Sequence, residues 1–255
     1  MEIQKYVINE TAWVELYHQN SPALSQDNPL PALIICPGGS YEHISERESE
    51  PLAFAFLAQG YQVFILNYTV MNKGTHHNFL NQNLQEVRAV FELINKHHRT
   101  WNIDPQKVFL LGCSAGGHLA ASYCTSHPFY QAKGLLLCYP VTSFSLGWPK
   151  QHPHFNFPLE DCSIYDSNLA ISAHTPPTFI WHTGSDLTVP IANSLVFCEH
   201  LAKVQVPFEA HFFEKGPHGL GLANRATAPT ERHFVPDVQR WFPWALNWVE
   251  RHLKK

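Results

Sequence analysis

Short apolar runs that stop at turn-forming residues alternate with helical segments along most of this chain. Four of these runs, Ala32–Cys36, Val108–Leu111, Leu135–Cys138 and Thr178–His182, lack a polar–apolar alternation, which indicates strands buried on both faces. A parallel sheet that is covered by helices on either side buries its strands in this way. The chain is therefore predicted to have an α/β fold, with a mostly parallel central sheet and helices on both faces.

The other regular segments fit the same plan. Further strands are expected at Ile3–Ile8, Trp13–Tyr17, Gln62–Leu66 and Phe208–Phe213, of which the first two would form an antiparallel hairpin. Helices are expected at Pro51–Gln59, Phe79–His98, His118–Ser126, Ile191–Ala202 and along the apolar face between Val238 and Val249.

One stretch, Thr142–Ala173, has several prolines, aromatic residues and histidines but no regular periodicity. A stretch of this length within a compact domain is typical of a lid or a binding loop, so residues 142–173 are a candidate lid or substrate-binding insertion. We find no internal repeat and no linker, and we expect residues 1–255 to form one domain.

Composition narrows the class of partner. Apolar residues make up 45% of the chain and charged residues 15%, which excludes a disordered tail or a coiled coil. With 17 basic and 21 acidic residues the net charge is −4, so neither a nucleic acid nor an anionic membrane surface is an expected partner. No apolar run approaches the roughly 18 residues that span a bilayer. The first residues, Met1–Lys5, lack a signal-peptide pattern, and we expect a cytoplasmic location. Association of the chain into a homo-oligomer stays open.

Cysteine and histidine spacing argues against a metal site. None of the six cysteines forms a Cys-x-x-Cys pair, and in a chain of this length they are expected to be buried free thiols. The 17 histidines show neither His-x-x-x-His nor His-Glu-x-x-His spacing, so we assign no metal and no other cofactor. His118 is expected to pack within a helix.

The segment Gly112–Gly116, with the sequence Gly-Cys-Ser-Ala-Gly, follows one predicted strand and precedes a helix. A serine hydroxyl is a poor nucleophile unless it is exposed, aimed and hydrogen-bonded to a base. A tight turn between a strand and a helix exposes and aims the side chain of Ser114, and the flanking glycines relieve its crowding. Ser114 is therefore the candidate nucleophile. The alternative is a glycine-rich turn with a structural serine.

A serine nucleophile on such a sheet requires an acid and then a histidine later in the chain. Asp186 follows the strand Thr178–His182, and His218 lies in a glycine-bounded loop after the strand Phe208–Phe213. Both positions are at the carboxyl ends of their strands, where catalytic groups of open α/β sheets gather. The competing acids are Asp161, Asp166 and Asp237.

An oxyanion hole needs backbone N–H groups from two places. The residue after the nucleophile, Ala115, should supply one of them. The loop Cys36–Tyr41, which follows a central strand and contains two glycines, is the expected source of the others.

At this point the chain resembles a known family. Its motifs Pro37–Tyr41, Gly112–Ala120 and Lys215–Gly221 resemble those of α/β-hydrolase esterases, specifically the branch of acetylxylan-esterase-like and carbohydrate-ester hydrolases. Shorter matches in the same order are Asn102–Pro105, Tyr139–Val141, Thr175–Pro177 and Gly184–Asp186, so the resemblance covers about residues 30–250.

The resemblance implies a role for each matching position. Ser114 would be the nucleophile, Asp186 the acid and His218 the base. Gly39, Ser40 and Ala115 would supply the N–H groups of the oxyanion hole. The chain departs from related lipases and esterases, which have His-Gly-Gly-Gly, because it carries Pro37 at the start of the motif and Ser40 at its end. The side chain of Ser40 would narrow the acyl pocket.

Together these observations predict a metal-free serine carboxylesterase that hydrolyses short-chain, chiefly acetyl, esters of sugars or oligosaccharides. Tyr41, Phe144 and Trp148 are the candidate substrate-binding residues, and the expected partner is a small-molecule ester. A formamidase or a prolyl-peptidase-like amide hydrolase would use the same triad. A non-catalytic binding module with the hydrolase fold is the third alternative, although such proteins usually lose a triad member.

Overall fold

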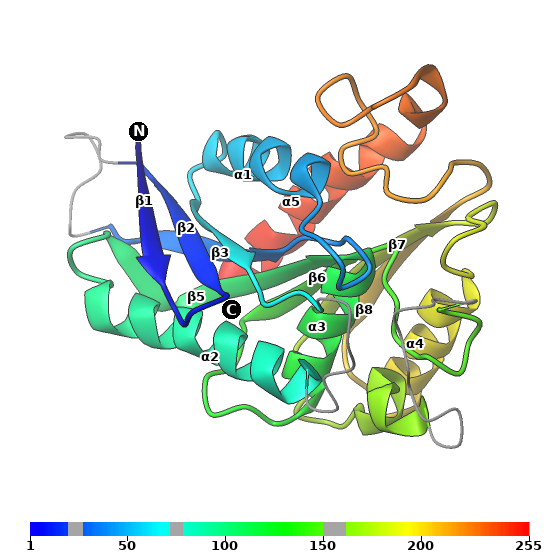
Figure 1. Ribbon diagram of the computed structural model, residues 1–255, viewed down its shortest axis with the longest axis horizontal. Helices are drawn as coiled ribbons and strands as arrows, with labels where there is room; N and C mark the ends of the chain where they lie inside the picture. The colour runs from blue at the N-terminus through cyan, green and yellow to red at the C-terminus, as the bar shows by residue number, and fades with distance from the viewer. Residues whose placement is uncertain (20–27, 72–78, 150–161, 255) are drawn as a thin grey trace.

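The computed structural model describes residues 1–19, 28–71, 79–149 and 162–254. These residues form an eight-stranded sheet with the strand order β1-β2-β4-β3-β5-β6-β7-β8 (Figure 1). The strands are β1 (Glu2–Val7), β2 (Trp13–His18), β3 (Leu30–Cys36), β4 (Gln62–Asn67), β5 (Ile103–Cys113), β6 (Gly134–Cys138), β7 (Thr178–Thr183) and β8 (Phe208–Phe213). Strands β3 to β8 are mutually parallel, whereas β1 and β2 add an antiparallel hairpin to the edge of the sheet next to β4. The predicted α/β fold is confirmed.

Helices cover both faces of this sheet (Figure 1). One face carries α1 (Glu50–Leu57) and α5 (Trp241–Leu253), and the other carries α2 (Phe79–His97), α3 (Ser114–Thr125) and α4 (Ala192–Lys203). Short 3₁₀ helices are η1 (Glu46–Glu48), η2 (Cys162–Tyr165), η3 (Ser167–Ala170), η4 (Glu231–His233) and η5 (Val238–Arg240). Among the described helices, none is both long and apolar enough to cross a membrane.

Two apolar cores lie on either side of the sheet because successive side chains of a strand point to opposite faces. In β3, Leu33 and Ile35 pack in the core under α1 and α5, whereas Ile34 and Cys36 pack in the core under α2 to α4. All four side chains are buried. The lack of polar–apolar alternation in this strand is thereby explained.

The boundaries of two elements differ from the sequence prediction. Strand β5 begins at Ile103, five residues before the predicted start, and pairs there with β3. Helix α3 begins at Ser114, whereas the prediction began it at His118. The glycines of the motif hid this first turn, because glycine ordinarily disfavours a helix. In the stretch 142–173, the described residues contain η2 and η3 and otherwise irregular chain, while residues 150–161 lie outside the described part.

Candidate active site

The turn between β5 and α3 places Ser114 at the carboxyl edge of the sheet. Ser114 adopts a φ angle of 54°, in the left-handed region that non-glycine residues rarely occupy. A β-carbon at Gly112 would strike the carbonyl group of Gly116, and one at Gly116 would strike the carbonyl oxygen of Cys36. The turn is therefore a strained strand-to-helix elbow that needs glycine at both flanking positions.

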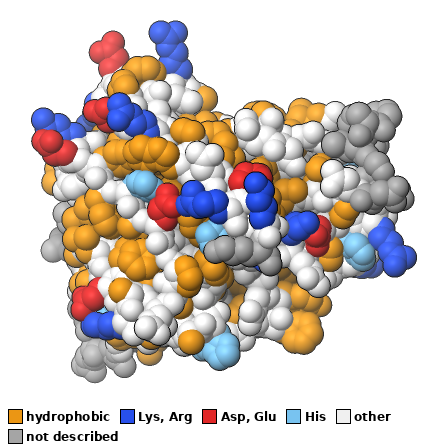
Figure 2. Space-filling view, turned by 180° about the vertical axis from the view of Figure 1, so that it is seen from behind, with side chains coloured by type: hydrophobic (Ala, Val, Ile, Leu, Met, Phe, Trp, Pro, Cys, Tyr) orange, Lys and Arg blue, Asp and Glu red, His pale blue; other side chains and the backbone are white. Residues whose placement is uncertain are grey.

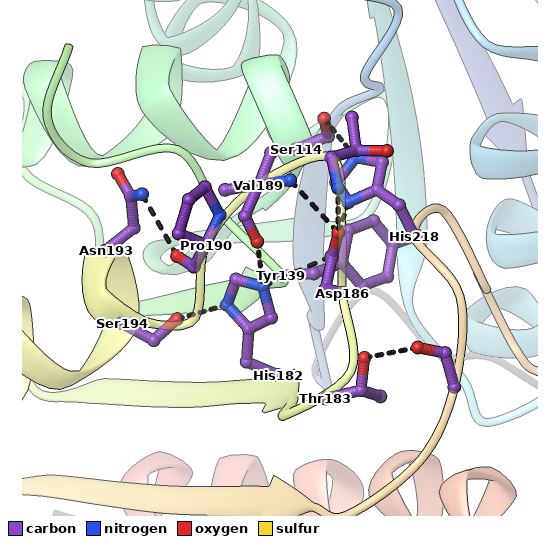
Figure 3. Close-up of polar contacts among 12 residues, drawn as sticks. Ser114, Tyr139, His182, Thr183, Asp186, Val189, Pro190, Asn193, Ser194 and His218 are labelled. Carbon is purple, nitrogen blue, oxygen red and sulfur yellow. Dashed lines mark hydrogen bonds and ion pairs between the residues drawn. The ribbon is translucent and has the colours of Figure 1, made fainter. Parts of the chain in front are cut away.

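Ser114, His218 and Asp186 form a hydrogen-bonded chain (Figure 3). His218 Nδ1 lies 2.6 Å from Asp186 Oδ2, and His218 Nε2 lies 2.7 Å from Ser114 Oγ. A carboxylate can only accept, so Nδ1 carries the proton and Nε2 is left to accept the hydroxyl proton of Ser114. The structure thus brings the three predicted residues together in the arrangement in which a histidine can deprotonate a serine.

Asp186 is buried and receives hydrogen bonds on both carboxylate oxygens. The backbone N–H groups of Thr188 and Val189 donate to Oδ1, at 2.8 and 3.0 Å. Burial alone would raise the pKa of this carboxyl group, but hydrogen bonds from His182 and His218 outweigh it and hold the pKa well below its ordinary value. Asp186 therefore stays ionised, as a residue that orients and stabilises an imidazolium must.

His182, the second-to-last residue of β7, is a member of the site that sequence reasoning missed. Its Nε2 atom lies 3.2 Å from Asp186 Oδ2 and 3.1 Å from the carbonyl oxygen of Val189, and its Nδ1 atom lies 2.7 Å from Ser194 Oγ (Figure 3). Both neighbours of Nε2 only accept, so Nε2 carries the proton and Nδ1 accepts from Ser194. The available signal was the position of His182 four residues before Asp186. Because the chain has 17 histidines, this spacing alone did not distinguish His182 from the others.

The loop that carries His218 is tied to the turn that carries Asp186. The hydroxyl groups of Thr183 and Ser185 donate to the carbonyl oxygen of Gly216, at 2.8 and 3.1 Å. The N–H group of Gly216 in turn donates to Ser185 Oγ at 2.9 Å. These bonds fix the position of His218 relative to Asp186.

The loop after β3 presents backbone N–H groups next to Ser114. Its carbonyl groups are engaged within the loop, because Gly38 O accepts from the N–H of Ser45 and Gly39 O accepts from the N–H of Glu42 and of His43. In a trans peptide the N–H points opposite to the preceding carbonyl, so the N–H groups of Gly39 and Ser40 point away from this turn. In the described part of the chain, neither of the two N–H groups has an acceptor.

One further observation places this loop beside Ser114. A β-carbon built at Gly38 would lie 2.9 Å from the β-carbon of Ser114, so the loop backbone contacts the serine directly. The N–H of Ala115 belongs to the first turn of α3, where backbone donors lack partners within the helix. Gly38 thus lies against Ser114, and the roles of Gly39, Ser40 and Ala115 as oxyanion donors stay a prediction.

The competing acids lie elsewhere. Asp166 is buried and accepts hydrogen bonds from the backbone N–H groups of Phe144 and Ser145. Asp237 is exposed and pairs with Arg240 at 3.7 Å. Asp161 lies outside the described residues.

The predicted substrate-binding residues belong to one buried group of rings. This aromatic cluster consists of Tyr41, Phe79, His118, Phe144, Trp148 and Tyr165. The ring centroid of Phe144 is 4.7 Å from that of His118 and 5.1 Å from that of Trp148. Because His118 lies one helical turn after Ser114, the cluster adjoins the nucleophile. Contact of Tyr41, Phe144 and Trp148 with a substrate stays a prediction.

Within the cluster, hydrogen bonds of the His118 ring connect Tyr41, in the loop after β3, with Tyr165, at the end of η2. Its Nε2 atom lies 2.6 Å from the carbonyl oxygen of Tyr165, so Nε2 carries the proton and Nδ1 accepts from the Tyr41 hydroxyl at 2.7 Å. Burial lowers the pKa of His118 to about 4, which keeps the ring neutral.

Within the described residues, no group of three or more histidine, cysteine or acidic side chains is placed to hold a metal ion.

On the face shown in Figure 2, acidic and basic side chains lie next to one another among apolar and uncharged ones.

Comparison with known proteins now identifies the family. The BD-FAE family model matches residues 20–133. A solved structure of a sugar hydrolase (YeeB) from Lactococcus lactis is 58% identical, with 99% of each chain covered and a TM-score of 0.93. MGS-M1, an α/β-hydrolase enzyme from a deep-sea metagenome library, is 30% identical, with 100% of this chain and 99% of the other covered and a TM-score of 0.84. This chain belongs to the α/β-hydrolase esterase family.

The curated relatives of this α/β-hydrolase are longer. An acetylxylan esterase from Xylanibacter ruminicola is 26% identical, over 75% of this chain and 41% of its own length. Across the curated relatives that it matches, the chain spans between 27% and 56% of their length.

Proposed function

We propose that this α/β-hydrolase is a serine carboxylesterase that cleaves short-chain esters, chiefly acetyl esters of sugars or oligosaccharides. The observation that carries the proposal is the hydrogen-bonded chain from Ser114 through His218 to Asp186. The loop of free N–H groups beside Ser114 is the second requirement of ester cleavage, because it can stabilise a negatively charged oxygen.

The geometry supports a two-step reaction. Ser114 Oγ attacks the ester carbonyl carbon while His218 Nε2 takes the hydroxyl proton, and Asp186 stabilises the resulting imidazolium. The carbonyl oxygen becomes negative and accepts hydrogen bonds from the N–H groups of Gly39, Ser40 and Ala115. His218 returns the proton to the leaving alcohol, which departs and leaves an acyl group on Ser114. A water molecule then attacks this acyl group by the same steps and releases the carboxylic acid.

The substrate class follows from the relatives and from the loop after β3. One similar protein is a sugar hydrolase and another is an acetylxylan esterase, which favours an acetyl group carried by a sugar. Ser40 has a φ angle of 57° and a β-carbon that a glycine would lack, so the loop is bulkier here than in relatives with three glycines. A bulkier loop favours a small acyl group.

The deciding experiment compares the protein with Ser114→Ala on p-nitrophenyl acetate and on acetylated xylo-oligosaccharides. We expect turnover of both by the wild type and only a residual rate in the variant, because the oxyanion hole and binding remain without the nucleophile. The matched control is Ser126→Ala, which removes a serine hydroxyl that bonds the carbonyl oxygen of Tyr123 at the end of α3. Equal turnover by the wild type and Ser114→Ala would refute the proposal.

A further inference from the structure

Glu48, at the end of η1, is a buried carboxylate that the reaction above does not use. Only 2% of this residue is exposed, and within the described residues no cation lies at ion-pair distance from it. Burying a carboxylate is costly unless hydrogen bonds compensate for its lost hydration. Its hydrogen-bond partners should therefore reveal what it does.

The first partner belongs to the oxyanion loop, which we define as residues 37–45. The N–H of Gly38 donates to Glu48 Oε2 at 2.8 Å. The carbonyl group of Gly38 accepts from Ser45, so both sides of this residue are held. Gly38 lies against Ser114, and its carbonyl belongs to the same peptide as the N–H of Gly39. Glu48 thus fixes the residue that aims the first N–H of the oxyanion hole.

The second partner leads to the histidine loop, which we define as residues 215–221. The hydroxyl group of Tyr139 donates to Glu48 Oε1 at 2.8 Å, and it accepts from the N–H of Gly221 at 2.8 Å. The Tyr139 ring also meets the His218 ring edge-on, with 5.1 Å between centroids (Figure 3). Tyr139 is itself buried directly after β6.

We propose that Glu48 is a positioning residue that, through Gly38 and Tyr139, holds the oxyanion loop and the histidine loop in one fixed arrangement. The inference rests on the proposed esterase function, because it concerns how the two loops act on a reacting ester. A carboxylate suits the role since both of its partners are donors. A glutamine would turn an NH₂ group toward one of them and lose that bond.

The expected signature is a loss in the chemical step with little loss in substrate binding. The oxyanion is present only in the transition state, so a displaced loop should lower kcat and leave KM nearly unchanged. We expect Glu48→Gln and Tyr139→Phe each to lower kcat by about 10- to 100-fold, because small displacements of positioned groups have effects of this size. The double variant should lose little more than either single variant, since both break the same connection.

The matched control is Tyr17→Phe. The hydroxyl group of buried Tyr17 donates to Glu50 Oε1 at 2.8 Å, so this variant removes a tyrosine–glutamate bond of equal length at the start of the neighbouring helix α1. This bond reaches neither loop, so kcat should stay within about twofold of the wild type. All rates are normalised to folded protein by circular dichroism, and Tyr139→Phe decides the question if Glu48→Gln does not fold.

A second readout separates this inference from the proposed function. The rate at which a fluorophosphonate probe labels Ser114 depends on the nucleophile and the oxyanion hole but requires no ester turnover. We expect labelling to slow in Glu48→Gln and Tyr139→Phe and to stay unchanged in Tyr17→Phe. Failure of the wild type to hydrolyse esters, with labelling still slowed in the variants, would refute the function alone. Labelling and kcat equal to those of Tyr17→Phe, or a loss confined to KM, would overturn the role of Glu48.

Discussion

Glycine is required around Ser114 because two backbone segments approach each other there more closely than a β-carbon allows. At Gly116 the obstacle is the carbonyl oxygen of Cys36, which belongs to the central strand β3 and has no room to move. At Gly60 the surroundings are open, and only the φ angle of 89° favours glycine. The two positions therefore separate a steric requirement from a conformational one.

We expect Gly116→Ala to reduce the free energy of unfolding by more than about 3 kcal/mol, because the methyl group must displace buried backbone. Gly60→Ala should cost only about 1 to 2 kcal/mol, the conformational penalty of a left-handed residue. Urea denaturation of the two variants and the wild type measures both values. Equal losses at the two positions would contradict the steric explanation.

The carboxylate of Asp186 is expected to act through the proton on His218 Nδ1. Asp186→Asn should lower kcat by about 10³- to 10⁴-fold, since an amide can turn its NH₂ group toward Nδ1 and stabilise the wrong tautomer. The control is Asp237→Asn, which neutralises an exposed aspartate in an ion pair with Arg240 and should leave kcat unchanged. Steady-state kinetics with p-nitrophenyl acetate provide the test, and a loss below tenfold would exclude Asp186 as the orienting acid.

At the scale of elements, the hydropathy pattern predicted the hairpin, the central strands and the main helices because each is encoded within a few consecutive residues. Strand β8 has the predicted bounds, and α2 ends one residue before its predicted end. Ser114, Asp186 and His218 could be chosen for the same reason, since each lies at or shortly after the end of a recognisable strand. The short helix η1 was not predicted, because three residues carry no periodicity.

The missed members of the site have a common physical cause. Glu48 and His182 act through contacts with residues from other elements, such as Tyr139 and Ser194, and the pairing of such partners depends on the packed fold. In the local sequence, Glu48 cannot be told apart from Glu46, which stands two residues before it. In the structure Glu46 is exposed and Glu48 is buried. Burial and hydrogen-bond partners distinguish the two, and these are properties of the tertiary structure.

The bridge that His118 makes from α3 to neighbouring elements predicts a pH dependence of stability. Its pKa is lowered to about 4 in the folded protein, against about 6.5 in an unfolded chain. Between these values the unfolded state binds the proton and the folded state does not. The contribution of the neutral His118 ring to the free energy of unfolding is therefore complete above pH 6.5. About 3 kcal/mol of it is lost as the pH falls toward 4.

The measurement is the free energy of unfolding by urea from pH 7.5 to 4, for the wild type and for His118→Asn. The difference between the two should shrink as the pH falls. His174→Asn, at an exposed histidine, serves as control and should run parallel to the wild type. A constant difference between wild type and His118→Asn would show that His118 titrates alike in both states.

At the scale of the whole molecule, the parallel sheet gathers distant segments at one edge. Ser114 and His218 are 104 positions apart, yet the strands before them end at the same edge, with β6 and β7 between (Figure 1). The oxyanion loop follows β3, the neighbour of β5 on its other side. Strand order therefore brings Ser114, Asp186, His218 and the oxyanion loop to one edge of the sheet, and the loops after the strands carry the side chains into contact.

The same arrangement predicts the preference for acyl chain length. We propose that the aromatic cluster beside α3 bounds the acyl site, so that an acyl chain longer than acetyl would have to displace packed rings. We expect kcat/KM to fall steeply from p-nitrophenyl acetate through butyrate to octanoate. Each methylene that the site does accommodate contributes about 0.8 kcal/mol, so a deeper pocket would reverse the order.

Truncating one ring of the cluster should weaken this preference. Phe144→Ala removes the ring that stacks on Tyr165 and contacts both His118 and Trp148, and we expect it to raise the butyrate-to-acetate ratio of kcat/KM by about four- to fifteenfold. This is the range of one to two methylenes' burial. Phe129→Ala, at a ring that is 83% exposed, is the matched control and should leave the ratio unchanged. A wild type that prefers octanoate, or a ratio that Phe144→Ala leaves unchanged, would show that the cluster packs the core without bounding the acyl site.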